Sequence, residues 1–185
     1  MMYDSYPPQL LSPTDVQAPQ RTRRLHQIGI DEKPDPEFDD FAHRIAELTG
    51  TPYALVNFIG EDHQYLGGLH VSPNAPPNEI VSMVESNRIL PPDYGYCPHV
   101  VTRRKALVLD DVCDYPRFAG NPVVDEIGLR SYLGAPLIDR TGVALGTICV
   151  VDLYPRPWGR DGLETIKSFA AELMIRIEQR EARVH

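Results

Sequence analysis

Two apolar segments near the C-terminal end, residues 131–138 and 143–151, constrain the fold more than any other feature. Each has the length and composition of a buried strand, and only four residues, ending in Gly142, separate them. A connection this short, with a glycine before the second segment, is typical of a β-hairpin. The chain is therefore expected to fold around a sheet that contains an antiparallel pair of strands.

Three further segments are predicted to be strands. Residues 52–59 are apolar enough for a buried strand, and residues 63–69 follow them after the turn sequence Gly-Glu-Asp. This arrangement predicts a second hairpin. Residues 106–109 form a short apolar run of the same kind.

A helix between residues 35 and 50 has both of its ends marked. Asp35 is a residue type that caps helix N-termini, Pro36 suits the first helical position, and Gly50 is a typical stop. The apolar residues between these ends repeat at helical spacing, at Phe38, Phe41, Ala42, Ile45 and Leu48. The pattern predicts one buried face. A shorter helix is expected before it, over about residues 20–27.

A long closing helix is predicted over residues 160–183, with Asp161 and Glu164 at the spacing of a capping box. Its apolar residues follow a three-four spacing, at Leu163, Ile166, Ala170, Leu173 and Ile177. Such a stripe most often packs on the core of its own domain. It also has the spacing of a coiled-coil seam, so pairing with a second copy of the chain is kept as the alternative.

The remaining segments are less regular. Residues 72–93 and 110–128 are expected to be mostly loop, because prolines and polar turn residues interrupt them, although residues 79–88 could form a short helix or an irregular strand. Residues 94–102 predict a turn that runs into a short helix with Pro98 at its first position. The order of these elements describes an α+β fold, in which one mainly antiparallel sheet carries helices on its faces.

Length and composition indicate one domain. We expect a mobile arm over residues 1–19, which carry four prolines and few apolar anchors, and a single domain over residues 20–185. The net charge of −8 repels a phosphate backbone, which argues against nucleic-acid binding. The chain has no apolar run of membrane-spanning length, no signal-peptide pattern and only three widely spaced cysteines. These features predict a cytoplasmic protein with no membrane contact.

Three ordered blocks of sequence carry a family resemblance. They are PDPEFDDFAHRIAELTGTPYALVNFIGEDHQY, YGYCPHVVTRRKALVLDDVCDYPRFAGNPVV and LRSYLGAPLIDRTGVALGTICVVD. Over roughly residues 22–182 the chain resembles the GAF family of bacterial signalling proteins. The resemblance implies about six antiparallel strands, with the first and last helices together on one face and a pocket under loops on the other. It leaves the ligand open, since family members bind cyclic nucleotides, haem, bilins, small anions or amino-acid-like molecules.

Aromatic and polar residues in the loop segments are the predicted lining of that pocket. Tyrosine supplies both apolar surface and a hydroxyl, which suits a binding pocket. His99 and Arg117 could add charge for an anionic ligand. The predicted ligand-binding residues are Tyr65, Tyr94, Tyr96, Cys97, His99, Arg117, Phe118 and Tyr132. The alternative is that the tyrosines are ordinary core residues.

Cys97 is the sharpest candidate for chemistry, because it precedes Pro98 at the predicted start of a helix, where a thiol pKa is lowered. The alternative is a small buried side chain that fills space. Free methionine sulfoxide reductases share the GAF fold and use an attacking and a resolving cysteine, but residues 125–133, where the attacking one is expected, contain no cysteine. A bilin photoreceptor would need a chromophore-binding motif that Cys-Pro-His only weakly resembles.

Metal ligands are not evident in the sequence. Cys97 and His99 cannot complete a zinc site without a second pair of ligands. Asp110, Asp111 and Asp114 could attract a cation, but such residues more often cap turns.

The function expected from the sequence is a stand-alone sensory module that binds a small molecule and is not an enzyme. Because no output segment follows residue 184, we expect the signal to pass to a signalling partner protein or through a homodimer of the terminal helices. No cofactor is identified by the sequence. The alternatives are an interaction module without a ligand and a thiol-dependent reductase.

Overall fold

One six-stranded antiparallel sheet forms the centre of residues 13–184, the part of the chain that this computed structural model describes. The strand order is β3-β2-β1-β6-β5-β4. The strands are β1 (Tyr53–Ile59), β2 (Gln64–Val71), β3 (Ile89–Leu90), β4 (Leu107–Leu109), β5 (Ser131–Ile138) and β6 (Ala144–Asp152). Both predicted hairpins are confirmed, and β1 pairs with β6 so that the two hairpins share the middle of the sheet.

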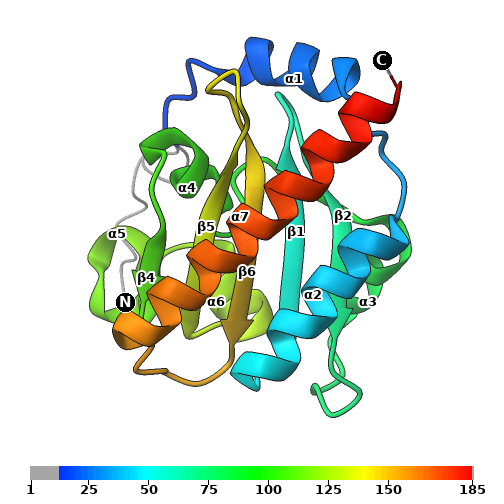
Figure 1. Ribbon diagram of the computed structural model, residues 1–185. Coiled ribbons are helices and arrows are strands. Elements are labelled where there is room, and N and C mark those ends of the chain that lie inside the picture. The colour runs from blue at the N-terminus through cyan, green and yellow to red at the C-terminus, as the bar shows by residue number, and fades with distance from the viewer. Residues whose placement is uncertain (1–12, 185) are drawn as a thin grey trace.

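Helices lie on both faces of this sheet, so the predicted α+β class is confirmed (Figure 1). They are α1 (Ala18–Gln27), α2 (Pro36–Thr49), α3 (Glu79–Asn87), α4 (Cys97–Arg103), the 3-10 helix η2 (Val112–Asp114), α5 (Pro116–Ala119), α6 (Pro122–Ile127) and α7 (Gly159–Val184).

The two long helices α2 and α7 lie across one face, which we call the helix face (Figure 1). Asp35 caps α2 as predicted, because its carboxylate accepts hydrogen bonds from the amides of Glu37 and Phe38 at 2.9 and 3.3 Å. Gly50 ends the helix with φ +67°. One residue of the expected buried stripe is different: Leu48 is exposed, and Ala46 is buried in its place.

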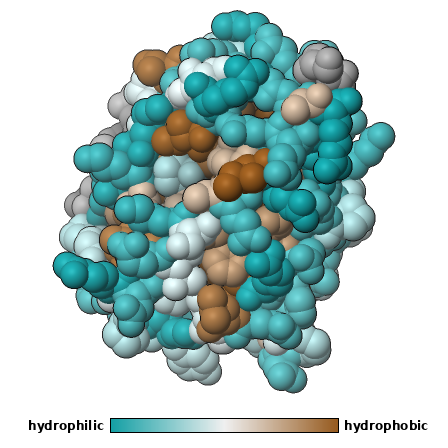
Figure 2. Space-filling view, viewed as in Figure 1, coloured by the Kyte–Doolittle hydropathy of each residue, from teal (hydrophilic) through white to brown (hydrophobic). Residues whose placement is uncertain are grey.

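The apolar stripe of α7 packs on the sheet. Ile166, Ala170, Leu173 and Ile177 are all buried in the same core as strands β1, β5 and β6. This confirms the first interpretation of the stripe, and Leu173 is not available to a second copy of the chain. The outer surface of this face is mainly hydrophilic, with separate apolar residues (Figure 2). Ile175 on α7 and Leu48 on α2 are among the exposed apolar side chains.

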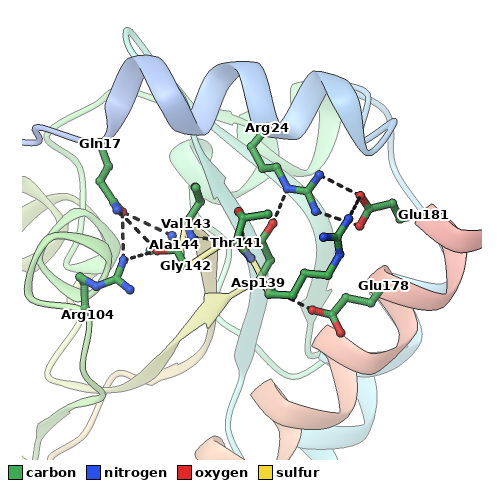
Figure 3. Close-up of polar contacts among 11 residues, drawn as sticks. Gln17, Arg24, Arg104, Asp139, Thr141, Gly142, Val143, Ala144, Glu178 and Glu181 are labelled. Atoms are coloured by element: carbon green, nitrogen blue, oxygen red, sulfur yellow. Dashed lines mark hydrogen bonds and ion pairs between the residues drawn. The ribbon is translucent and has the colours of Figure 1, made fainter.

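A buried ion-pair network joins α1 to the β5–β6 hairpin and to the end of α7 (Figure 3). The guanidinium of Arg24 donates to both Glu181 carboxylate oxygens at 2.8 Å, and its Nε donates to Asp139. Ordered structure begins before residue 20, since Asp15 pairs with Arg21 at 2.6 Å. Residues 1–12 of the predicted arm lie outside the described residues.

The other face, which we call the loop face, carries short elements from α3 to α6 (Figure 1). Residues 79–88 are largely helical, as one of the two interpretations predicted. Residues 110–128 contain η2, α5 and α6 rather than loop alone. Proline stands at the start of α5 and α6, and the side chain of Asn121 caps α6, so these helices start readily but end within two turns.

Strand alternation divides the apolar residues between two cores. In β6, Ile148 and Val150 belong to the core under α2 and α7, whereas Cys149 and Val151 belong to the core of the loop face. Neighbouring positions of one strand therefore contact opposite sides of the molecule.

Candidate functional site

The loop face contains a cavity of about 90 Å³ between the sheet and its cover. Its floor comes from β1, β2, β5 and β6, and its cover comes from α3, α6 and the segment before α4. The cover is thin over α3, where Val84 is the single fully buried side chain and Met83 is exposed. The wall is formed mostly by aliphatic side chains and tyrosine rings.

The surface that the cavity wall presents is apolar, although several tyrosines line it. The Tyr53 hydroxyl is buried, and within residues 13–184 no hydrogen-bond partner reaches it. Burial raises the pKa of Tyr53, and the Glu85 carboxylate on α3 raises it further. Burial also raises the pKa of Tyr94, and the nearby Glu126 carboxylate adds to this effect. Both hydroxyls therefore stay protonated, and the tyrosines contribute their rings to the wall.

A buried cluster around Cys97 forms one end of the cavity. The Cys97 sulfur lies 3.7 Å from that of Cys149, and both residues line the cavity. The Thr147 hydroxyl donates to the Cys97 sulfur at 3.0 Å, and the Tyr132 hydroxyl lies 3.2 Å from it. All four side chains are buried. We call Cys97 and Cys149 the dithiol.

Gly134 makes this cluster sterically possible. A Cβ atom at this position would lie 2.4 Å from the Tyr132 hydroxyl, so the tyrosine side chain folds back over a position without a side chain. The pleat places Tyr132 opposite Val151 on the loop face, and the missing Cβ lets its hydroxyl reach the dithiol.

The dithiol loses its first proton more easily than an ordinary cysteine. The pKa of Cys97 is lowered mainly because the Cys149 thiol donates a hydrogen bond to the Cys97 thiolate, and burial opposes this effect. Thr147, Tyr132 and Asn57 add further stabilisation of the thiolate. The pKa of Cys149 is raised in turn, first because its thiol proton is held in the hydrogen bond to Cys97, and then by burial and by the negative charge on Cys97.

The predicted site residues divide into three groups. Tyr94, Tyr96, Cys97 and Tyr132 line the cavity. His99, Arg117 and Phe118 form an adjoining cluster outside that lining, in which the His99 Nδ1 and Arg117 Nη2 atoms are 3.4 Å apart and the His99 and Phe118 rings pack edge to face. Tyr65 lies elsewhere, beside a surface groove with Phe58 and His63.

Tyr96 connects the first two groups. Its hydroxyl donates to the Phe118 carbonyl at 2.8 Å, and its ring packs edge-on against the rings of both Phe118 and Tyr132. This tyrosine is buried and has its hydroxyl paired, so it also supports the cavity wall in the manner of a core residue.

Sequence reasoning did not single out Tyr53, Thr147 or Cys149 as site residues. The signal that could have found them is strand alternation, because Tyr53 and Tyr132 both lie opposite Val151 in the sheet and Cys149 lies two positions away on the same face. Of the acidic group, Asp111 caps its turn as expected, because it accepts from the Cys113 amide, whereas Asp110 accepts from the distant Trp158 amide.

The described residues contain neither a cluster of metal ligands nor a membrane-spanning helix. Across residues 13–184, no three His, Cys, Asp or Glu side chains gather in a way that could hold a metal ion. None of the helices in this range is both long and apolar enough to span a membrane.

The sequence pattern of the family described as GAF domain matches residues 34–177. The chain belongs to the GAF family. It is 27% identical over 160 residues to a cyclic di-GMP phosphodiesterase of Pseudomonas aeruginosa, and the match covers 85% of this chain but only 25% of that protein. The chain therefore spans about a quarter of the length of this relative.

Solved GAF structures have the same fold. The phycocyanobilin-bound GAF domain of a cyanobacterial phytochrome gives a TM-score of 0.64 at 15% identity, covering 91% of this chain and 95% of that one. The free methionine-R-sulfoxide reductase of Neisseria meningitidis, in complex with its substrate, gives 0.62 at 16% identity, covering 94% and 97%. At this level of identity the likeness shows the fold and not the activity.

Proposed function

We propose that this GAF domain is a sensory module that binds a small, mostly apolar molecule in the cavity of the loop face and relays its binding to a partner protein. The observation that carries the proposal is the cavity itself, an unfilled volume lined by aliphatic side chains and tyrosine rings. The atoms around an unfilled volume lack packing contacts, and a bound apolar molecule would supply them. The family and its signalling relatives are consistent with such a role.

The size and polarity of the cavity define the class of ligand. A volume of about 90 Å³ suits a molecule of roughly three to four non-hydrogen atoms, given that benzene, which has six, occupies an engineered cavity of about 150 Å³. The aliphatic side chains and tyrosine rings of the wall favour an apolar molecule. A tetrapyrrole or a cyclic nucleotide is far larger than this space.

The relay is proposed to run through the sheet. Cys149 and Val151 border the cavity, while Ile148 and Val150 of the same strand pack under the long helices. A ligand that displaces β6 would therefore change the packing of α7. Binding can shift such an equilibrium only as far as the ligand prefers one state.

The partner is proposed to contact the outer side of α7. The inner stripe of this helix is occupied by the sheet, whereas Ile175 is 56% exposed. A second copy of the chain is one candidate partner, and a separate cytoplasmic signalling protein is the other. Ile175→Glu should weaken the assembly, and Met83→Glu, on the opposite face, should leave it unchanged. An unchanged assembly state for Ile175→Glu in sedimentation analysis would remove α7 as the contact.

We propose binding rather than catalysis, because the cavity is lined by aliphatic side chains, tyrosine rings and thiols rather than by a pair of acid–base groups. The surrounding side chains leave the cavity unfilled, which favours a ligand site over a purely structural interaction module.

Cyclopropane, an apolar molecule of three non-hydrogen atoms, is a suitable probe, and its binding can be followed by NMR titration of the backbone amides. We expect shift changes in β1, β6 and α3 that saturate with cyclopropane concentration. Val84→Phe should fill the cavity and abolish these changes, whereas Met83→Phe, at the exposed neighbouring position, should keep them. Shift changes that persist in Val84→Phe, or that map to the helix face, would contradict the proposal.

A further inference from the structure

Two buried sulfur atoms face each other at one end of the cavity, and the binding role proposed above does not use them. The Cys97 and Cys149 sulfurs are 3.7 Å apart as free thiols, on the separate elements α4 and β6. Cys113, the third cysteine, is exposed and lies on η2. The chain thus contains one close pair of cysteines, and the exposed Cys113 serves as an internal control for their reactivity.

The surroundings of the pair favour a reactive thiolate rather than an inert filler. The Thr147 hydroxyl donates to the Cys97 sulfur, and the Tyr132 hydroxyl lies within hydrogen-bond distance of the same atom. A sulfur that receives several donors carries negative charge more easily, and the thiolate is the nucleophilic form of cysteine. The lowered pKa of Cys97, due first to Cys149, agrees with this geometry.

The cavity provides the route by which a small reagent reaches these atoms. Both cysteines are at most 5% exposed, so a bulky reagent such as glutathione disulfide cannot reach their sulfur atoms from the surface. Both also line the cavity, whose aliphatic wall admits a compact apolar molecule. An alkyl hydroperoxide combines an apolar body with a reactive oxygen–oxygen bond.

We propose that Cys97 and Cys149 form a peroxide-reactive dithiol, which a small hydroperoxide that enters the cavity oxidises to a disulfide. This inference goes beyond the sensory role and does not depend on the identity of its ligand.

The chemistry balances in two steps. The Cys97 thiolate attacks the terminal oxygen of ROOH, so that a sulfur–oxygen bond forms, the oxygen–oxygen bond breaks, and the alkoxide leaves and takes up the proton released by the thiol. The products are a sulfenic acid on Cys97 and the alcohol ROH. The Cys149 sulfur then attacks the Cys97 sulfur, the sulfur–oxygen bond breaks, and water leaves with the Cys149 proton. Two thiols lose two electrons in total, and one hydroperoxide gains them.

Disulfide formation would also change the site. A disulfide bond is about 2.05 Å long, so the sulfurs must approach from 3.7 Å and draw the start of α4 toward β6. The hydrogen bonds of Thr147 and Tyr132 to the thiolate would be lost. The cavity end formed by these residues would therefore differ between the reduced and oxidised chain.

The experiment treats the reduced full chain with one equivalent of ethyl hydroperoxide under native conditions, followed by differential alkylation and peptide mass spectrometry. We expect a disulfide between the peptides of Cys97 and Cys149, with Cys113 still a thiol. Cys149→Ser should stop at a sulfenic acid on Cys97 that dimedone traps once the chain is unfolded in urea, and Cys113→Ser should react at the rate of the unmodified chain. Oxidation of Cys113 alone, or no Cys97–Cys149 disulfide after the peroxide is consumed, would overturn the proposal.

A second variant separates reactivity from folding. Thr147→Val keeps the shape of the side chain and removes the hydroxyl that donates to Cys97, so oxidation should slow about tenfold at neutral pH. The pH at which the rate is half-maximal should rise, which a purely structural role of Thr147 would not produce. An unchanged pH profile in a variant with an unchanged circular dichroism spectrum would remove Thr147 as the positioning residue.

Discussion

The two faces of the sheet belong to the same strands, but they differ in the length of the covering helices and in how completely the interior is packed. On the helix face, α2 and α7 are long, their inner sides are filled with apolar side chains, and buried charges are paired. On the loop face, the covering helices have between three and nine residues, and a cavity of about 90 Å³ remains.

This difference indicates a division of roles between the faces. Well-packed interiors contain few voids larger than a water molecule, so an unfilled volume costs packing contacts and stability. The tightly packed helix face can supply the stability that the loop face lacks.

The largest effect is expected at Arg24, on the helix side of the molecule. Arg24→Met leaves the carboxylates of Asp139 and Glu181 without their main partner in a buried setting, which should cost about 3–5 kcal/mol in the free energy of unfolding. Arg44→Met removes an exposed pair with Glu172 and should cost less than about 1 kcal/mol. Urea denaturation measures both. Equal losses would show that the buried network in Figure 3 stabilises the fold no more than the exposed pair does.

A matched pair of leucines compares the packing of the two faces directly. Leu173, on the inner side of α7, is 0% exposed, and Leu129, on the cavity wall, is 5% exposed. Leu173→Ala should cost about 2–5 kcal/mol, because it creates a new cavity in a filled core. Leu129→Ala should cost less, since this side chain already borders empty volume and loses fewer contacts. A larger loss at Leu129 would contradict the comparison.

Acid should weaken the helix face through Asp35. Burial opposes ionisation of this carboxyl, but the Arg180 guanidinium and the amides of α2 outweigh it and hold its pKa below the usual 3.8. A carboxyl with a depressed folded pKa contributes its stability above the unfolded pKa and loses it as the pH falls through the folded pKa. Asp35→Asn should therefore cost about 1 kcal/mol at pH 7 and almost nothing below the folded pKa.

Urea midpoints across pH 2 to 7 measure this dependence. Asp40→Asn, at an exposed position of the same helix, is the matched control and should show no such pH-dependent difference. A cost of Asp35→Asn that stays constant down to pH 2 would contradict the assignment.

Alkali should lower the free energy of unfolding through Tyr132 on the loop face. Near neutral pH this residue should have no such effect. Burial raises the pKa of Tyr132 well above its usual value, and negative charge on Cys97 raises it further. A raised folded pKa means that this contribution is complete below about pH 10, the value of an unfolded tyrosine, and is lost as the pH rises through the folded pKa. Tyr132→Phe should make stability less sensitive to pH above 10, whereas Tyr154→Phe, at an exposed position, should not. Equal pH dependence in both variants would remove Tyr132 as the cause.

The sequence predicted the fold well where its signals are local. Asp35, Pro36 and Gly50 mark the ends of α2, and Gly142 marks the turn of the last hairpin, because caps and turns depend on a few adjacent residues. The short β3 strand was missed, since two residues carry no periodicity. The short helices of residues 110–128 were missed for a related reason, as their prolines indicate loops and helix starts equally.

The candidate site was predictable only in part. Tyr94, Cys97 and Tyr132 were expected near a pocket, and they line the cavity. The proximity of Cys97 to Cys149 depends on how α4 lies on β6, and the reach of the Tyr132 hydroxyl to them depends on the missing side chain of Gly134. Sequence spacing reports neither. Tyr65 was assigned to the pocket, but the bulge in the β1–β2 pairing and strand alternation place it beside the groove with His63 instead.

The central claim is that the loop face holds an apolar ligand cavity and the helix face does not. A crystal of the reduced chain under xenon pressure tests it directly, because xenon enters apolar cavities without needing polar partners. We expect xenon to bind in the loop-face cavity, between Val84, Leu129 and Cys149. Xenon bound beneath α7 instead, or none on the loop face, would contradict it.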